Sequence, residues 1–395
     1  MTNSKQPRLY SRSLALLIVT GISYFVVAGI SFPVLPRLVK VELGGDDFDI
    51  GLVFGVMGLG MLFMRPFIGF LADKYGRKPM IIYGATTILI MQLLHVPAAR
   101  SGLWVLLLVR IVLGMGSSAM YVGLATMATE LPPAERSGEI FSMFNVAVVT
   151  GFAVGPVIGE IALQQVGFDA AFGLGALFAG VCLLLGVLLP ETRPSSVQAR
   201  FEGVKSLLHP VAVRSGAVSF LLFGAFISFN AFVTPYAESM GIQTVRWILL
   251  SYAATSVITR LIGGRFIDTA DRKLLGSCAH GIVLIGLLVV IVFQNHASLY
   301  FGAVIMAVGL SFNVPLMVVI AADSTTPDQR SRVVATVIVF GDLANSFAAF
   351  AFGALAGGVG YRGMYIAVAV MVAVAAVLYR SKFMDPVTGL LKNSR

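Results

Sequence analysis

The chain has 395 residues, of which 57% are hydrophobic and only 12% charged, and its mean hydropathy is +0.90. Because about a quarter of the residues in a soluble domain are charged, this composition excludes a soluble enzyme or binding domain and predicts an all-α integral membrane protein. The formal net charge of +9 comes from residues scattered over loops, so it does not indicate nucleic-acid binding.

Twelve apolar segments follow one another along the chain, each close to the roughly 20 residues that a helix needs to cross a bilayer. A long polar linker, residues 190–213, separates the sixth segment from the seventh. The sequence therefore predicts an N-terminal six-helix bundle (1–189), the linker, and a C-terminal six-helix bundle (214–395). The predicted spans are residues 14–36, 50–71, 79–98, 103–128, 139–163, 170–189, 214–237, 246–268, 274–293, 297–322, 333–357 and 362–381.

The basic residues predict how the spans are oriented. Of the 28 Lys and Arg, 20 lie in or at the edge of segments on the same side as the two termini, and five lie on the opposite side. The other three, Arg65, Arg110 and Arg260, lie deeper inside spans. The positive-inside rule therefore places both termini in the cytoplasm of a cell-membrane protein.

A fifteen-residue pattern occurs twice, as MRPFIGFLADKYGRK at 64–78 and TRLIGGRFIDTADRK at 259–273, 195 positions apart. A second shared pattern, in 130–137 and 323–331, places an acid at the end of an even-numbered span and Arg-Ser before the next one. These repeats predict two copies of one ancestral unit, an architecture in which transporters bind substrate between the copies. The matched residues are Arg65 and Arg260, Gly69 and Gly264, Asp73 and Asp268, Arg77 and Arg272, and Lys78 and Lys273.

These motifs resemble those of the major facilitator superfamily over nearly the whole chain. GFLADKYGRK at 69–78 resembles motif A of that family, and 263–273 is a weaker copy. LLLVRIVLGMG at 106–116 resembles motif B, with Arg110 as its arginine. The glycines of 151–159 resemble motif C, which is associated with exporters, although Glu160 stands where a second glycine is usual.

The resemblance implies twelve transmembrane helices in two pseudo-symmetric six-helix bundles and a latch on the cytoplasmic side. In the family the motif A acid faces span eleven. The resemblance also implies that Arg77 pairs with Glu130 and, by the repeat, that Arg272 pairs with Asp323. Ordinary solvated loop charges are the alternative interpretation. The residues assigned to the latch are Asp73, Arg77, Lys78, Glu130, Arg136, Asp268, Arg272 and Asp323.

Charged residues inside the spans are candidates for proton coupling, because charge in a bilayer is costly. Arg110 lies roughly 10 Å deep in span four and should find a carboxylate, a carbonyl or substrate. The resemblance links this arginine to proton movement. By contrast, Arg65 and Arg260 are expected to extend along the membrane toward its cytoplasmic surface and to serve packing and anchoring.

Two intramembrane acids could bind and release a proton, because burial disfavours the charged form of a carboxylate. Asp342 lies near the midplane in span eleven and is the first candidate, with a structural hydrogen bond to Asn345 as the alternative. Glu160, near the outer end of span five, is the second candidate and is expected to be wetted at the mouth.

Two further sets of residues concern packing and substrate. Gly151, Gly155 and Gly159 share one helix face and should let another helix approach closely, while Pro156 should bend the span. Spans one, four, seven and ten should line an aromatic, amide-rich cavity that suits an apolar or amphipathic molecule. Its predicted lining residues are Tyr24, Phe25, Tyr121, Phe226, Phe229, Asn230, Tyr236, Phe312 and Asn313.

The sequence thus favours a secondary transporter that exports a small apolar or amphipathic organic compound in exchange for protons. A sugar or metabolite permease, a lipid flippase, and a non-transporting sensor or scaffold are the alternatives. We expect a monomer in contact with membrane lipid and a small-molecule substrate. We expect no enzymatic activity, no metal, and no cofactor other than the proton as coupling ion, since no catalytic or metal-ligand signature occurs.

Overall fold

The computed structural model describes residues 12–131, 137–193, 208–242, 244–326, 329–381 and 384. Within these ranges the regular structure is helical, which confirms the all-α prediction. The helices are α1 (Arg12–Glu42), α2 (Asp47–Tyr75), α3 (Arg77–Ser101), α4 (Leu103–Glu130), α5 (Ser137–Gln165), α6 (Phe168–Leu188), α7 (Pro210–Ser239), α8 (Arg246–Thr269), α9 (Arg272–Phe293), α10 (His296–Asp323) and α11 (Arg330–Arg380).

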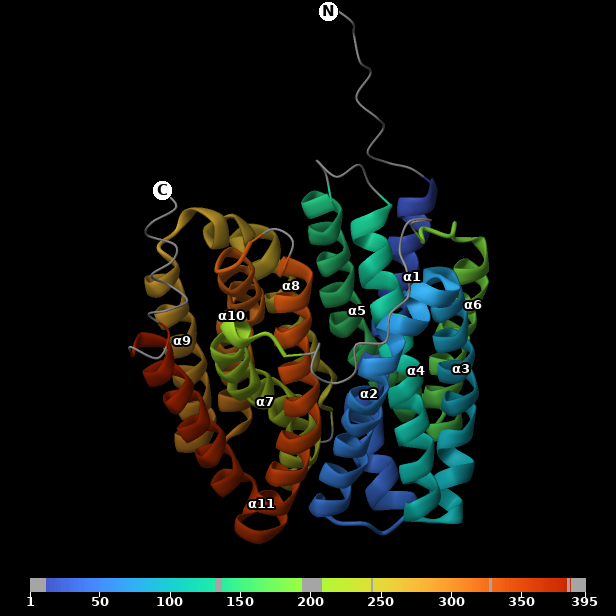
Figure 1. The fold of residues 1–395 in the computed structure, drawn as a ribbon. Coiled ribbons are helices and arrows are strands. Elements are labelled where there is room, and N and C mark those ends of the chain that lie inside the picture. Colours follow the sequence, from blue (N-terminus) through green and yellow to red (C-terminus); the bar gives the residue numbers. More distant parts are fainter. Residues whose placement is uncertain are drawn as a thin grey trace, which may run out of the picture.

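These helices supply the twelve predicted spans. Ten of the eleven described helices are long and apolar enough to cross a membrane. The remaining helix is α8, which is less apolar and carries Arg246 and Arg260. The last element, α11, contains two spans, because Gly360 breaks its 51 residues with a φ of 73°. Figure 1 shows the two spans of α11 meeting at a sharp turn at one end of the molecule.

The first helix extends further than the predicted span, which ended at residue 36. Helix α1 continues to Glu42 despite Pro33 and Pro36, so Arg37 and Lys40 stand on the helix rather than in a loop. The prediction ended the span at the first charge after the prolines. The helix continues because its last turns remain buried, with Leu38 and Val39 in the core.

The packing of the helices repeats between the two bundles (Figure 1). Helix α1 packs on α5 as α7 packs on α11, and α2 packs on α4 as α8 packs on α10. The bundles meet chiefly through α2 against α11 and α5 against α8, which are equivalent pairs under the repeat. The two-bundle, pseudo-symmetric architecture of the prediction is thereby confirmed.

The contact of α1 with α5 resembles that of α7 with α11 at the level of side chains. A Cβ on Gly21 would lie 3.2 Å from the ring of Phe144, and one on Gly216 would lie 2.3 Å from the ring of Phe340. Gly21 and Gly216 are 195 positions apart, so both helix pairs place a phenylalanine against the equivalent glycine.

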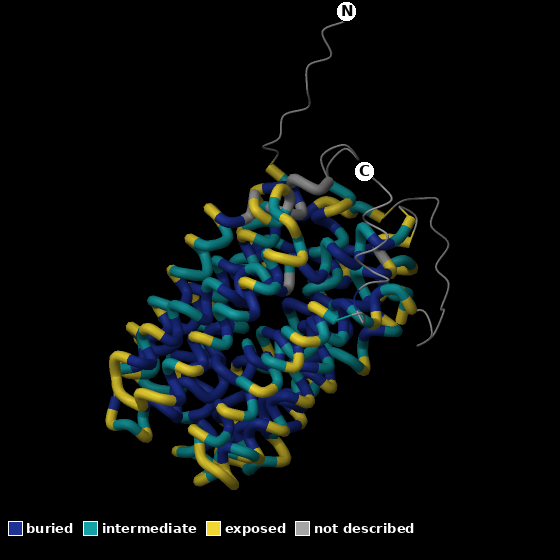
Figure 2. Tube along the Cα trace, turned by 90° about the vertical axis from the view of Figure 1, so that its left-hand side faces the viewer, coloured by how far each residue is buried: buried dark blue, intermediate teal, exposed yellow. Residues whose placement is uncertain are grey.

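The two ends of the molecule are named by the elements that they carry. The motif end carries the start of α1, the turn from α2 to α3 and the end of α4; the far end carries the turn from α1 to α2 and Gly360. Between these ends, the outward faces of the helices expose large apolar side chains such as Trp104, Leu108 and Val377, as expected for contact with lipid. Figure 2 shows the buried residues concentrated in the interior and between the helices.

Candidate functional site

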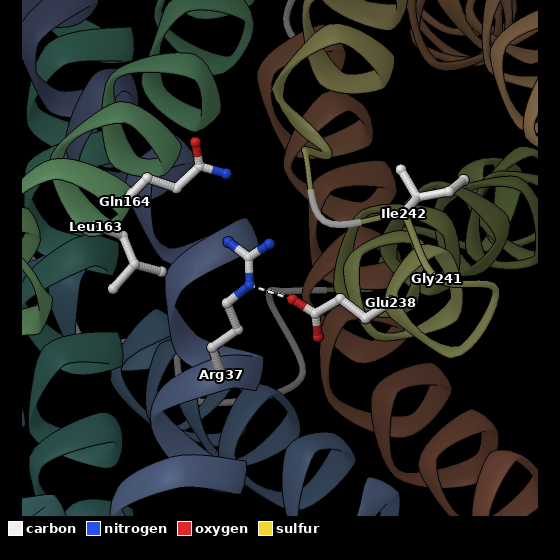
Figure 3. A pocket seen from close by; sticks show the side chains of 6 residues that line it. All are labelled: Arg37, Leu163, Gln164, Glu238, Gly241 and Ile242. Carbon is white, nitrogen blue, oxygen red and sulfur yellow. Dashed lines mark hydrogen bonds and ion pairs between the residues drawn. The ribbon is translucent and has the colours of Figure 1, made fainter.

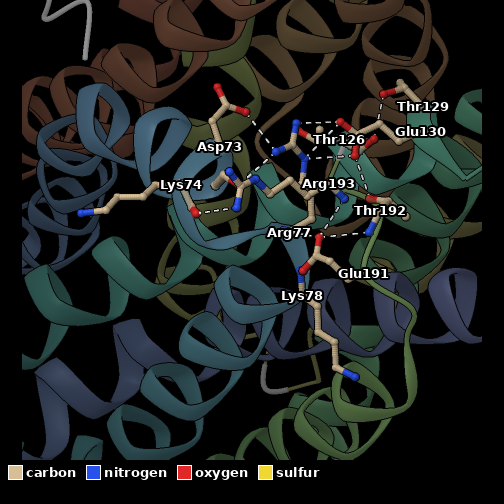
Figure 4. Close-up of polar contacts among 11 residues, drawn as sticks. Asp73, Lys74, Arg77, Lys78, Thr126, Thr129, Glu130, Glu191, Thr192 and Arg193 are labelled. Carbon is tan, nitrogen blue, oxygen red and sulfur yellow. Dashed lines mark hydrogen bonds and ion pairs between the residues drawn. The ribbon is translucent and has the colours of Figure 1, made fainter. Parts of the chain in front are cut away.

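The first charge cluster surrounds Arg77 at the motif end (Figure 4). The guanidinium of Arg77 lies 2.7 Å from the Glu130 carboxylate and 3.0 Å from that of Asp73, and it also donates to the Ala72 carbonyl at 2.9 Å. The predicted pairing of Arg77 with Glu130 is present. Among the described residues Asp73 pairs with Arg77 in its own turn, and this cluster lies within the N-terminal bundle.

The segment after α6 completes this cluster, which the sequence interpretation missed. Glu191 accepts hydrogen bonds from the backbone amides of Arg77 and Lys78 at 2.8 and 3.2 Å, so a carboxylate stabilises the positive end of α3. Gly76 makes room for it: a Cβ there would lie 2.2 Å from the Glu191 carboxylate, and the residue has a φ of 109°. Thr192 donates to Glu130 at 2.7 Å.

The second charge cluster repeats the first within the C-terminal bundle. Arg272 lies 2.8 Å from Asp323, as the repeat predicts, and Arg330 approaches the same carboxylate at 3.8 Å. The latch assignment also included Arg136, which lies outside the described residues, and Asp268, whose side chain the structure does not describe.

One ion pair joins the two bundles inside the membrane. Arg65 of α2 donates from Nε to the carboxylate of Asp342 of α11 at 2.5 Å, and both side chains are buried. The guanidinium also lies 5.7 Å from the ring centre of Tyr121. Asn345 contacts the sulfur of Met61 rather than Asp342. The prediction that Arg65 extends toward the membrane surface is therefore wrong, because an acid from the other bundle holds it in the interior.

A second connection between the bundles lies at the far end (Figure 3). Arg37 of α1 forms an ion pair with Glu238 of α7, which Figure 3 draws. It forms another with Glu160 of α5 and thereby joins a carboxylate from each bundle. Glu160 has 0% exposure. The expectation that Glu160 is wetted at the mouth is wrong, because the extended α1 brings Arg37 over its carboxylate.

A tyrosine adds to this far-end connection. Tyr361, just after the Gly360 turn, donates to Asp47 of α2 at 2.7 Å, and Lys40 lies 3.0 Å from both Asp47 and the Tyr361 hydroxyl. A pocket of about 390 Å³ opens beside Arg37 and Glu238 between α1, α5 and α7. The far end of the bundle interface is therefore held by charge, whereas the two motif-end clusters lie within single bundles.

Arg110 donates a hydrogen bond to a backbone carbonyl, which is one of the three kinds of partner that the sequence predicts for it. Its Nε donates to the Val53 carbonyl at 3.0 Å and its guanidinium lies 5.6 Å from the ring centre of Phe54. Its exposed fraction is 1%, and the described residues place no carboxylate against it. This arginine joins α4 to α2 within the N-terminal bundle and does not contact Asp342.

The glycines of α5 pack directly on α1, as predicted. A Cβ on Gly151 would lie 2.6 Å from the Ile22 carbonyl oxygen, and one on Gly155 would lie 2.5 Å from that of Val26. Gly159 continues this contact at Ile30, one residue before Glu160. Gly29 in turn faces Pro156. The glycine face thus brings α1 and α5 close enough for Arg37 to meet Glu160.

The structure brings several of the predicted lining residues together and separates others. Phe25 lies 6.2 Å from Tyr121, and Phe226 lies 6.0 Å from Phe152, with Phe152 4.9 Å from Phe25. These rings form an aromatic cluster across the bundles, and the sequence interpretation missed Phe152 because it lies in span five.

Tyr24 joins this aromatic cluster, because its ring centre lies 4.6 Å from that of Phe25. The remaining predicted lining residues make other contacts. Phe229 stacks on Tyr252, and Tyr236 packs against Tyr361 and Tyr365. Tyr24 donates to the Ser117 carbonyl, Asn230 donates to the Phe226 carbonyl, Phe312 faces Gly263, and Asn313 is fully buried.

Comparison with known proteins agrees with this arrangement. The sequence profile described as Major Facilitator Superfamily matches residues 16–246 and 218–394. The uncharacterized MFS-type transporter YhhS of Escherichia coli (strain K12) is 24% identical over 379 residues, which cover 94% of this chain and 92% of YhhS. The multidrug resistance protein MdtL of Citrobacter koseri is 26% identical over 313 residues, 76% of this chain and 77% of MdtL.

Among solved structures, a D-xylose-proton symporter has a TM-score of 0.77 at 16% identity, with 95% of this chain and 98% of that chain covered. The family match and the two packed helical bundles place the chain among integral membrane proteins of the secondary-transporter class. The chain belongs to the major facilitator superfamily.

Proposed function

We propose that this transporter exports a small apolar or amphipathic organic compound in exchange for protons by alternating access. The observation that carries the proposal is the buried ion pair between Arg65 and Asp342, which spans the bundle interface. A buried pair is strongly destabilised when one partner loses its charge. Protonation of Asp342 would therefore release α2 from α11 and couple proton binding to movement of the bundles.

The substrate side of the proposal rests on the aromatic cluster of Phe25, Phe152, Phe226 and Tyr121. Rings from both bundles meet there, and their apolar surfaces suit an apolar or amphipathic compound better than a sugar. The relative MdtL is named a multidrug resistance protein, which supports the same class of substrate.

The orientation that the basic residues predict indicates which side of the protein is closed. With the motif end in the cytoplasm, the far-end contacts of Arg37 and Tyr361 close the outer side. The structure then corresponds to a state closed toward the outside. The motif-end clusters would act as latches in the opposite state, when the cytoplasmic ends of the bundles approach each other.

The test compares transport with binding for Asp342→Asn in proteoliposomes. Substrate-dependent proton flux should be lost, because Asn cannot carry the proton, while equilibrium binding of the same compound should persist. The compounds to screen are amphipathic aromatic molecules, and folded protein is matched by size-exclusion chromatography. Full accumulation driven by a pH gradient in Asp342→Asn would remove Asp342 as the proton carrier.

A further inference from the structure

Arg260 is the counterpart of Arg65 in the second copy of the repeat. Arg65 and Arg260 are 195 positions apart in the matched motifs, and they lie on the equivalent helices α2 and α8. Helix α5, which packs on α8 as α11 packs on α2, has no acidic residue between Glu139 and Glu160. The interface of α5 and α8 therefore keeps the arginine of the buried ion pair and lacks its acid.

Arg260 has no carboxylate partner among the residues that the structure describes. Its Nε is buried and without a hydrogen-bond partner. Its electrostatic neighbour is the phenol of Tyr252 on the same helix. Tyr252 lies eight residues earlier, about 12 Å along the helix, on the side away from the predicted cytoplasmic surface.

Further polar groups lie on the helices around α8. Helix α10 packs on α8, with Phe312 against Gly263, and the next residue, Asn313, is fully buried with neither amide atom hydrogen-bonded. Tyr252 lies beside Asn230 of α7. Helices α7, α8 and α10 thus carry a phenol and two amides in the same bundle as Arg260.

We propose that Arg260 binds the carboxylate of the substrate, which takes the role that Asp342 has for Arg65 in the other half of the molecule. A guanidinium inside a span stays charged and binds carboxylates through its planar fork, so an unpaired one needs an anion. The substrate class is therefore a small monocarboxylic acid with an apolar or aromatic body. This inference rests on the proposed transport function and adds the charge of the substrate to it.

The first test measures binding of benzoate and of its neutral analogue benzamide to the full-length protein. The protein is held in phosphatidylcholine nanodiscs, which contain no anionic lipid, and calorimetry gives the affinities. Benzoate should bind more tightly than benzamide, and Arg260→Gln should weaken benzoate at least about tenfold, which corresponds to roughly 1.4 kcal/mol. Arg260→Lys should recover only part of the affinity, because it restores the charge without the fork.

The matched control is Arg380→Gln, which removes an exposed arginine from the end of α11. It should leave benzoate binding unchanged. The inference is overturned if benzoate binds wild type no better than benzamide, or if Arg260→Gln keeps the affinity of wild type.

Asp342→Asn separates this inference from the proposed function. If Asp342 carries the proton and Arg260 binds the anion, Asp342→Asn loses gradient-driven transport of benzoate but retains its binding. Retained transport in Asp342→Asn with binding lost in Arg260→Gln would reject the proton role and support the anion site. The reverse pattern would reject the anion site alone.

Discussion

At the scale of single residues, the Arg65–Asp342 ion pair joins α2 to α11 inside the membrane. Removal of one partner leaves an uncompensated buried charge, which costs about 3–5 kcal/mol in proteins. We expect Arg65→Gln to lower the free energy of unfolding by an amount in this range, and the double variant Arg65→Gln/Asp342→Asn to recover much of it. Denaturation in detergent of the four proteins of this cycle measures the coupling, and additive losses would contradict the pairing.

The sequence allowed only half of this pair to be predicted. Asp342 stands out because an acid near the midplane of an apolar span is rare, but nothing local distinguishes Arg65 from a surface-reaching arginine. The two residues are 277 positions apart, and only the packing of α2 on α11 brings them together. The same holds for Glu160, whose partner Arg37 reaches it only because α1 continues past its two prolines to Glu42.

At the scale of helices, the contact of α1 with α5 depends on the absence of side chains. We expect Gly155→Val to lower stability by about 1–3 kcal/mol, because its Cβ would lie 2.5 Å from the Val26 carbonyl oxygen and force the helices apart. Gly173→Val in α6 is the matched control, since nothing lies within 4 Å of a Cβ there. Thermal unfolding of both variants provides the measurement, and equal melting temperatures would contradict the close-packing role.

Helices were the elements that the sequence predicted best, because their hydropathy and length are local properties. The number of spans, the repeat and the glycine face of α5 all follow from residue spacing. The ends of the helices were harder to predict. Helix α1 continues past two prolines because its last turns are buried, and a single turn at Gly360 joins two spans. The role of Glu191 was missed because a carboxylate that stabilises α3 from after α6 leaves no pattern near α3 itself.

At the scale of the whole molecule, the far-end ion pairs should set the balance between the two access states. We expect Glu238→Gln to shift the protein toward the state open at the far end, because it removes the C-terminal bundle's carboxylate from Arg37. A cysteine introduced at Gln164, beside the pocket, should then react faster with a membrane-impermeant maleimide added from outside.

The matched control for this shift is Glu42→Gln. Glu42 pairs with Arg100 at the same end, at 3.3 Å, but both residues belong to the N-terminal bundle. Its loss should leave the labelling rate at the level of the parent protein. Equal acceleration by the two variants would mean that general loosening, rather than the connection between bundles, controls access.

The two contacts of α2 with α11 lie at different depths along α2. Asp47 and Arg65 are 18 residues apart on α2, about 27 Å, and Asp342 lies 18 residues before Gly360, at the turn that carries Tyr361. If the helices tilt about the inner contact by about 10°, the far contact moves by roughly 5 Å on this lever arm while the inner one hardly shifts. Such a tilt would therefore break the Tyr361–Asp47 hydrogen bond, whereas the Arg65–Asp342 ion pair would remain until one partner loses its charge.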